Sequence, residues 1–192
     1  MKFETNSILP QEFYNRPTMD VARDLLGKTL IIKSRDSICS GRIVETEAYL
    51  PENDPACHAF CGVTPRNIVM FGSAGTTYVY FCYGIHWMFN AVTEAEGKGA
   101  AVLIRAVKPI NGISTMQERR KNPNIKDLTN GPAKICQAFN ISKTHNGNPL
   151  FSDNLNTPII VENEFSPNKI IVTSRIGLSV GTDLKARFVS ED

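Results

Sequence analysis

The sequence predicts one mixed α/β (α+β) domain, residues 1–192, in which most strands pair antiparallel. Three observations lead to this prediction. Short runs rich in β-branched and aromatic residues follow one another at intervals typical of hairpins. Three other segments carry apolar residues at helical spacing. No repeat, low-complexity tract or long linker divides the 192 residues, which are enough to bury a single core.

The first expected elements are a helix and a hairpin. Residues Thr18–Leu26 should form the helix, because a threonine can cap it, apolar residues recur at helical spacing, and Gly27 can end it. Leu30–Ile32 is then a short apolar strand. We expect it to pair with Arg42–Glu47 across the polar turn Ser34–Ser37.

The later elements follow the same two patterns. The segment at residues 54–64 is expected to be a loop or a short helix. The turn Tyr83-Gly84 should separate two strands of one hairpin. The remaining strands are predicted at Thr76–Cys82, His86–Val92, Ala100–Val107, Ile159–Val161 and Ile170–Val172. The remaining helices are predicted at Asn111–Arg120 and at Gly131–Asn140, where a Gly-Pro pair suits a first turn.

Composition excludes few classes of function. The chain has 42% hydrophobic and 21% charged residues, which is ordinary for a globular protein, and a net charge of +2, which does not indicate nucleic-acid binding. No apolar run approaches the roughly 18 residues that a membrane span needs, so we expect no membrane partner. The first residues lack an apolar targeting core. We therefore expect a protein that is not secreted, located in the cytoplasm (with the bacterial nucleoid) or in the nucleus.

The five cysteines, an odd number, favour reduced thiols over a disulfide framework. The group Cys57-His58-x-x-Cys61 could suggest zinc, but no second ligand pair of suitable spacing follows it. We therefore predict no metal. A metal- or cysteine-dependent hydrolase centred on this group stays open as an alternative.

The run Arg42–Leu50 holds the most informative residues of the chain. Glu45 and Glu47 lie two positions apart, so on a strand they share one face and could simply be solvated. However, Glu47 lies two residues before Tyr49 and eleven before His58. A carboxylate, an aromatic ring and an imidazole in this order indicate a site for proton transfer beside a flat ring.

A cluster of tyrosines on the predicted hairpin suggests what that ring is. Tyr78 and Tyr80 share a strand face, and Tyr83 lies at the hairpin tip beside Gly84. Such a tip residue often folds back on its sheet, but an exposed ring there could also push between base pairs and unstack them. Asn90, at the far end of the hairpin, could read or block a base edge.

Arg105 is a charge inside an otherwise apolar strand, Leu103–Val107. A buried arginine needs a partner, and Glu45 or Glu47 is the natural candidate. The pair could be purely structural. It could equally keep a carboxylate ionised beside a reacting water.

Ten motifs, in order and at compatible spacing, give the chain a wider resemblance. They are ETEAY (Glu45–Tyr49), Cys57-His58, Thr64–Asn67, Met70-Phe71, Gly75–Tyr80, Tyr83-Gly84, Asn90, Leu103–Ala106, Gly131–Gln137 and Arg175–Gly177. Together they closely resemble the alkyladenine (3-methyladenine) DNA glycosylase family, over about residues 17–188.

The resemblance implies a DNA glycosylase that flips alkylated or deaminated purines, such as 3-methyladenine, hypoxanthine and ethenoadenine, out of duplex DNA. No lysine lies within the segments Glu45–Tyr49 and Tyr78–Tyr80, where a Schiff-base nucleophile would be expected, so we predict a monofunctional enzyme that uses water. In this family the second glutamate of ETEAY activates water, so Glu47 is the expected general base. Arg105 and the main-chain carbonyl of Leu178 would hold that water. The residues that match the family's base pocket are Tyr49, His58, Tyr80 and Asn90, of which Asn90 would exclude the 2-amino group of guanine.

The resemblance also assigns the DNA contacts and the fold. Tyr83 matches the side chain that fills the gap left in the duplex, and Lys143 and Ser179 match phosphate contacts more loosely. The implied fold is a curved antiparallel sheet like that of the formyltransferase C-terminal domain. The implied chemistry needs no metal or cofactor, and the expected partner is duplex DNA with a damaged base, bound by a monomer.

Two features depart from the family pattern. Ala74 stands where a proline often precedes the glycine, and no tryptophan precedes Arg187-Phe188. The second change could alter packing behind Leu178 and therefore the placement of the water. The short N-terminus suggests a minimal, bacterial form. A catalytically silent protein that binds flipped bases in the same pocket is the second alternative.

Overall fold

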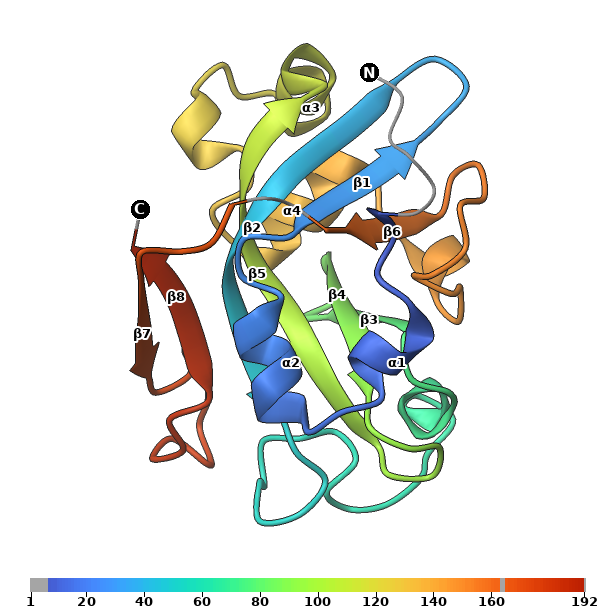
Figure 1. The fold of residues 1–192 in the computed structure, drawn as a ribbon, viewed down its shortest axis with the longest axis vertical. Helices are drawn as coiled ribbons and strands as arrows, with labels where there is room; N and C mark the ends of the chain where they lie inside the picture. Colours follow the sequence, from blue (N-terminus) through green and yellow to red (C-terminus); the bar gives the residue numbers. More distant parts are fainter. Residues whose placement is uncertain (1–6, 163–164, 192) are drawn as a thin grey trace.

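Strands β2 (Ile38–Tyr49) and β5 (Ala100–Asn111) are the two longest strands and pair antiparallel along most of their length (Figure 1). They belong to a computed structural model that describes residues 7–162 and 165–191. Both strands are apolar where they are buried, as expected for the centre of a sheet. This central pair carries Glu47 and Tyr49 on β2 and Arg105 on β5.

The other elements surround the central pair. The remaining strands are β1 Thr29–Lys33, β3 Thr77–Cys82, β4 His86–Thr93, β6 Pro158–Val161, β7 Lys169–Thr173 and β8 Arg187–Glu191. The α-helices are α1 Gln11–Tyr14, α2 Thr18–Asp24, α3 Ile113–Arg120 and α4 Pro132–Phe139. Short 3-10 helices lie at Ile68–Phe71, Ile125–Asp127 and Lys143–His145.

All strand pairs in the described sheet are antiparallel, and its main order is β3-β4-β5-β2-β1-β6. The second edge of β2 is shared between two partners. Its first residues pair with β1, whereas Glu45–Glu47 pair with Arg187–Val189 of β8, which continues to β7. Because β2 changes partner halfway, the sheet curls into a half-barrel (Figure 1).

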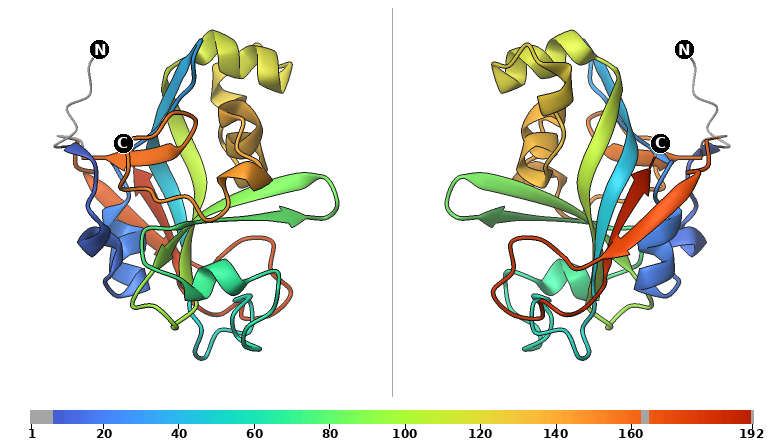
Figure 2. Two further views of the ribbon diagram at one scale, coloured as in Figure 1. Left: turned by 90° about the vertical axis from the view of Figure 1, so that its right-hand side faces the viewer. Right: turned by 90° about the vertical axis from the view of Figure 1, so that its left-hand side faces the viewer.

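Helices cover both faces of this sheet. Helices α1 and α2 lie on one face, and α3 and α4 lie on the other (Figure 2). The β3–β4 hairpin projects from the second face, below α4 (Figure 2). Apolar side chains of α2 and α4, including Val21 and Phe139, pack into the same core as the strands. The hairpin therefore stands clear of the core at its tip.

The structure confirms a mixed α/β domain with an antiparallel sheet and corrects several boundaries. The strand predicted at Arg42–Glu47 extends to Ile38–Tyr49, and the part nearest the site pairs with β5 and β8 instead of β1. The helix predicted from Asn111 begins at Ile113, because β5 runs through Asn111 and Gly112 then turns at a φ of 73°.

Three kinds of element were not predicted. Helix α1 is a single turn, and the 3-10 helices are equally short, so neither shows a clear periodicity. Strand β8 was not predicted, although it pairs with Glu45–Glu47 of β2. The segment at residues 54–64 forms turns without a helix. In the described part of the chain, every helix is too short or too polar to cross a membrane.

Candidate active site

A cleft of about 360 Å³ opens between the β3–β4 hairpin, strand β5, the end of β2 and the start of α4. This volume lies within the range of small-molecule sites. Seven of the predicted site residues line it together, namely Tyr49, His58, Tyr80, Tyr83, Asn90, Arg105 and Leu178. A polar cavity of about 540 Å³ between β1 and α4 has none of these residues in its lining. The first cleft is therefore the candidate site.

Glu47 lies directly behind the wall of this cleft, with no solvent-exposed surface. Its Oε2 accepts a hydrogen bond from the Tyr49 hydroxyl at 2.8 Å, and its Oε1 accepts one from the Ile176 main-chain N–H at 2.9 Å. Arg105 Nη1 lies 3.3 Å from Oε1. A carboxylate has about four acceptor positions, so three close donors hold it firmly and still leave room for one more.

Arg105 joins the two acidic residues of β2. Its Nε donates to Glu45 Oε1 at 2.7 Å, and Arg187 Nε donates to the same oxygen at 2.6 Å. Burial opposes the charge of Arg105, but the neighbouring carboxylates of Glu47 and Glu45 outweigh it and raise the arginine pKa. Arg105 therefore stays a cation, with N–H groups beyond these two contacts available for a water.

An irregularity in the sheet helps to place these groups. Between β2 and β5, Ile43 pairs with Val107 and Glu45 with Ala106, so the register shifts by one residue. Such bulges bend a strand and change where its side chains point. Thr46 then faces the opposite side, where its hydroxyl donates to the Ala22 carbonyl of α2 at 2.7 Å. Glu45 and Glu47 share the other face by ordinary strand alternation, and both contact Arg105.

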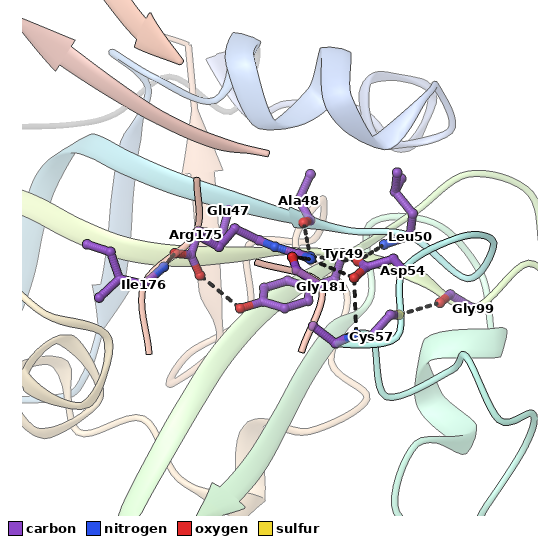
Figure 3. A network of polar contacts seen from close by, with 11 residues as sticks. Glu47, Ala48, Tyr49, Leu50, Asp54, Cys57, Gly99, Arg175, Ile176 and Gly181 are labelled. Atoms are coloured by element: carbon purple, nitrogen blue, oxygen red, sulfur yellow. Dashed lines mark hydrogen bonds and ion pairs between the residues drawn. The ribbon is translucent and has the colours of Figure 1, made fainter. Parts of the chain in front are cut away.

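The far side of Tyr49 is packed against a buried ion pair (Figure 3). Arg175 donates to both carboxylate oxygens of Asp54 at 2.6 Å, and neither side chain is exposed. The Arg175 guanidinium lies 4.6 Å from the centre of the Tyr49 ring. Burial, followed by the Glu47 charge, raises the pKa of Tyr49, so its hydroxyl keeps the proton that it donates to Glu47.

The opposite wall of the cleft is aromatic. Tyr78 and Tyr80 share one face of β3, as predicted, with ring centres 5.3 Å apart. His58 lies edge-on to Tyr80 at 4.5 Å, and its Nδ1 is 2.9 Å from the Tyr78 hydroxyl. Burial and then the charge of Arg66 lower the His58 pKa to about 4, and burial raises the pKa of Tyr78 to about 12. Both groups are therefore neutral near pH 7.

Asn90 and Tyr83 occupy opposite ends of this wall. Asn90 is buried, and its Nδ2 donates to the Tyr78 carbonyl at 3.0 Å, which fixes the amide at the base of the cleft. Tyr83 is 83% exposed at the hairpin tip, so the alternative in which its ring folds back onto the sheet is wrong. Tyr83 also has a positive φ of 52°, which is uncommon for an aromatic residue.

Besides Glu47, two predicted residues lie outside the cleft lining. Lys143 is exposed in the 3-10 turn Lys143–His145, and Ser179 is exposed in the loop that follows Leu178. The Cys57-His58-Cys61 group does not assemble into a site, since Cys57 is buried, Cys61 is exposed and His58 is bonded to Tyr78. Across residues 7–162 and 165–191, no cluster of three metal-binding side chains occurs.

Four residues that support the site were not predicted from the sequence. They are Tyr78 as the partner of His58, Ile176 as a donor to Glu47, and the pair formed by Asp54 and Arg175. Arg175 and Ile176 belong to one of the ten motifs, which was a signal for them. Asp54 lies in an irregular loop and gave none, because its partner is 121 positions away.

Comparison with known proteins identifies similar sequences. A family model described as methylpurine-DNA glycosylase matches residues 12–192. A protein of Prosthecochloris aestuarii named "Putative 3-methyladenine DNA glycosylase" is 46% identical over 95% of this chain and 88% of its own length. Proteins of the same name from Francisella tularensis and Carboxydothermus hydrogenoformans are 46% and 44% identical, over 91% and 94% of each chain.

Proposed function

Because the chain belongs to the methylpurine-DNA glycosylase family, we propose that it removes damaged purines from duplex DNA by hydrolysis. Family membership indicates a DNA glycosylase, an enzyme of DNA repair. The substrates that we propose are alkylated or deaminated purines of the 3-methyladenine, hypoxanthine and ethenoadenine class. The observation that supports this most directly is the buried Glu47 carboxylate behind an aromatic cleft that can hold one flat base.

The reaction begins with extrusion of the nucleotide. Tyr83, exposed beside the cleft, occupies the space that the nucleotide leaves in the stack. Unstacking costs a few kcal/mol, and the cost is smaller for damaged or mismatched bases. The extruded base enters between Tyr49 and the rings of His58 and Tyr80, where stacking favours electron-poor, cationic purines.

Hydrolysis then exchanges two bonds at C1′ of the sugar. The C1′–N bond breaks with its electron pair going to the base, and a water oxygen bonds to C1′. Glu47 accepts the proton of that water and later releases it to solvent. An alkylated, cationic base leaves as a neutral molecule. Hypoxanthine must gain one proton, which balances the proton that the water loses.

The position of the water follows from the contacts of Glu47. Since Glu47 has no exposed surface, the water must enter at its weakest contact. Arg105 Nη1 is its most distant donor, at 3.3 Å, whereas the other two donors lie within 2.9 Å. We place the water between Glu47 and Arg105, with the Leu178 carbonyl as the third partner. Glu47 and Arg105 thereby bring opposite charges to one reacting molecule.

The groups that we propose for selecting the base, His58 and Asn90, are neutral. We propose that the Tyr78 phenol donates to His58 Nδ1, so that the His58 proton lies on Nε2 and can be donated to an acceptor on the base. Asn90, fixed by the Tyr78 carbonyl, blocks a purine that carries a 2-amino group. Among the residues that the structure describes, the lining of the cleft contains no lysine. We therefore propose a monofunctional enzyme, since strand cleavage through a Schiff base would need an amine there.

The test is single-turnover release of hypoxanthine from an inosine-containing duplex and of 3-methyladenine from methylated DNA. We expect activity in the wild type and a loss of about 10²- to 10⁴-fold in Glu47→Gln, the usual contribution of a general base. Glu52→Gln serves as the matched control and should be fully active, because Glu52 is exposed in the loop that follows β2. A wild type that binds the duplex and releases no base would support the silent-binder alternative.

Strand cleavage is measured in the same reactions. We expect intact abasic strands and no covalent adduct after borohydride reduction, and an adduct would contradict the monofunctional mechanism. Activity that disappears in a chelator would support the metal hydrolase. The likeness to the formyltransferase C-terminal domain, the monomeric state, the location with the DNA, and the phosphate contacts of Lys143 and Ser179 stay predictions.

A further inference from the structure

A buried ion pair beside the cleft takes no part in the chemistry proposed above. Arg175 holds both oxygens of Asp54, and the two side chains have no exposed surface. Asp54 also accepts the N–H groups of Leu50 and Ala56, at 3.1 and 3.2 Å. A buried pair adds little net stability, because desolvation offsets the attraction between its charges. Its main consequence is therefore where it places the two segments that it joins.

Both segments lead directly to the reacting groups (Figure 3). On one side, Arg175 Nη1 donates to the Ala48 carbonyl at 2.9 Å, and Ala48 lies between Glu47 and Tyr49 on β2. On the other side, the next residue, Ile176, donates its N–H to Glu47. The same guanidinium lies over the Tyr49 ring. This cation thus neighbours two of the three donors to the carboxylate, the Tyr49 hydroxyl and the Ile176 N–H.

The loop after Arg175 is shaped to close over the pair. Gly181 has a φ of 62° and accepts a hydrogen bond from Arg175 Nη2 at 3.2 Å. A Cβ at this position would lie 3.2 Å from Asp54 Oδ1 and 3.3 Å from Arg175 Nη2. The loop between Arg175 and Gly181 includes Leu178, whose carbonyl is a proposed partner of the water. The ion pair therefore holds both ends of the segment that carries this carbonyl.

We propose that Arg175 and Asp54 are positioning residues for hydrolysis, which set the Glu47 carboxylate, the Tyr49 ring and the Leu178 carbonyl in register. This proposal rests on the proposed function. In this proposal the ion pair does not bind the base, since neither side chain lines the cleft. Loss of the pair should slow the hydrolytic step and leave extrusion and base binding in place. A merely structural pair would affect stability alone.

The first test variant is Arg175→Lys, which keeps the charge and loses the two-pronged contact with Asp54. We expect its single-turnover rate on an inosine duplex to fall roughly 10- to 100-fold, because displacement of about 1 Å can cost that much. The dissociation constant for the duplex should change less than about threefold. The fluorescence of 2-aminopurine next to the lesion, which reports extrusion, should match that of the wild type.

The matched control is Arg119→Lys, at a position outside the cleft lining. Arg119 is also partly buried and donates to the Ala138 carbonyl at 3.0 Å, so its replacement should cost stability as well. Urea unfolding of both variants measures that cost. We expect Arg119→Lys to keep the wild-type rate. If the two variants lose stability alike and both keep the wild-type rate, the positioning role is overturned.

A second variant, Arg175→Ala, tests the same role by chemical rescue. Low concentrations of guanidinium should restore part of its rate by refilling the space beside Asp54, and the same concentrations of urea should not. If Arg175→Ala is folded and slow yet guanidinium has no effect, the proposal is wrong. If it does not fold, the comparison of the two lysine variants decides. A wild type without activity would refute the proposed function instead, before any variant is compared.

Discussion

The two walls of the cleft are built in opposite ways. The wall behind Tyr49 is buried, with Glu47 and the pair Asp54–Arg175 hydrogen-bonded and removed from solvent. The hairpin opposite ends in exposed apolar side chains, with Tyr83 83% and Ile85 69% exposed. The first wall holds its side chains through hydrogen bonds and ion pairs. In the proposed mechanism the second wall enters the DNA stack, because its tip is exposed.

This difference assigns separate tasks to the two walls. Changes in the buried wall should alter the rate of hydrolysis and the stability of the fold. Changes at the hairpin tip should alter extrusion and leave stability nearly unchanged, since exposed surface residues contribute little to it. A change at the hairpin tip that lowers stability, or a change in the buried wall that alters extrusion alone, would contradict this distinction.

The largest expected effect separates the two acids of the buried wall. Glu47→Gln should lower the single-turnover rate by about 10²- to 10⁴-fold. Glu45→Gln should lower it far less, because Glu45 is held by Arg105 and Arg187 and does not contact the water in the proposed mechanism. It should instead cost roughly 1–3 kcal/mol of unfolding free energy, the usual value of hydrogen bonds to charged groups. Urea denaturation and base release, measured on both variants, test this.

The structure makes the outcome for Glu45 informative in either direction. If folded Glu45→Gln is as slow as Glu47→Gln, then Arg105 needs Glu45 to hold the water and the two acids act as one unit. Arg187→Lys is the matched companion, since Arg187 contacts Glu45 from β8 without reaching the cleft lining. It should lose stability and keep most of the rate.

The next largest effect concerns the exposed wall. Tyr83→Asn should slow base release from a well-paired duplex about 10-fold, because stacking between an aromatic ring and a base is worth roughly 1–3 kcal/mol. Stability should be equal or slightly higher, since asparagine tolerates the positive φ of 52° better than tyrosine. The loss should shrink for a lesion in a weakly stacked mismatch. A melting temperature that falls with the rate would show that the tip also supports the fold.

The same contrast explains which parts could be predicted from the sequence. The hairpin was predicted nearly to the residue, because alternation and the turn Tyr83-Gly84 are local signals. Glu47 could be identified from its spacing to Tyr49 and from the family motif. The contact of Arg105 with both Glu45 and Glu47 went beyond the sequence, which offered the two acids as alternatives.

The support of the buried wall could not be predicted for a physical reason. Asp54 and Arg175 meet only after the chain has folded, and each lies in a segment without regular structure. Strand β8 was missed although its residue Arg187 reaches Glu45. Local periodicity carries no information about contacts between such distant segments. The sequence therefore indicates the proposed reacting groups more clearly than the groups that hold them.

The smallest expected effect is a dependence of stability on pH that comes from the aromatic wall. The folded protein lowers the pKa of His58 from 6.5 to about 4, so between these values the unfolded chain binds more protons than the folded one. The His58 contribution is complete above about pH 6.5 and is lost as the pH falls towards 4. The change should be on the order of 1 kcal/mol, less than the ideal value because the ring is partly solvated.

Urea denaturation of the wild type and of His58→Gln, each at about pH 7 and about pH 4.5, isolates this contribution. The difference in stability between the two proteins should shrink at the lower pH. Burial lowers the pKa of His145 as well, but His145 is present in both proteins and cancels in the comparison. Arg66→Gln should make the loss smaller and complete it at a higher pH, without a change in sign, because the Arg66 charge helps to lower the pKa of His58 in the folded protein. A stability difference that does not depend on pH would show that folding does not lower the His58 pKa.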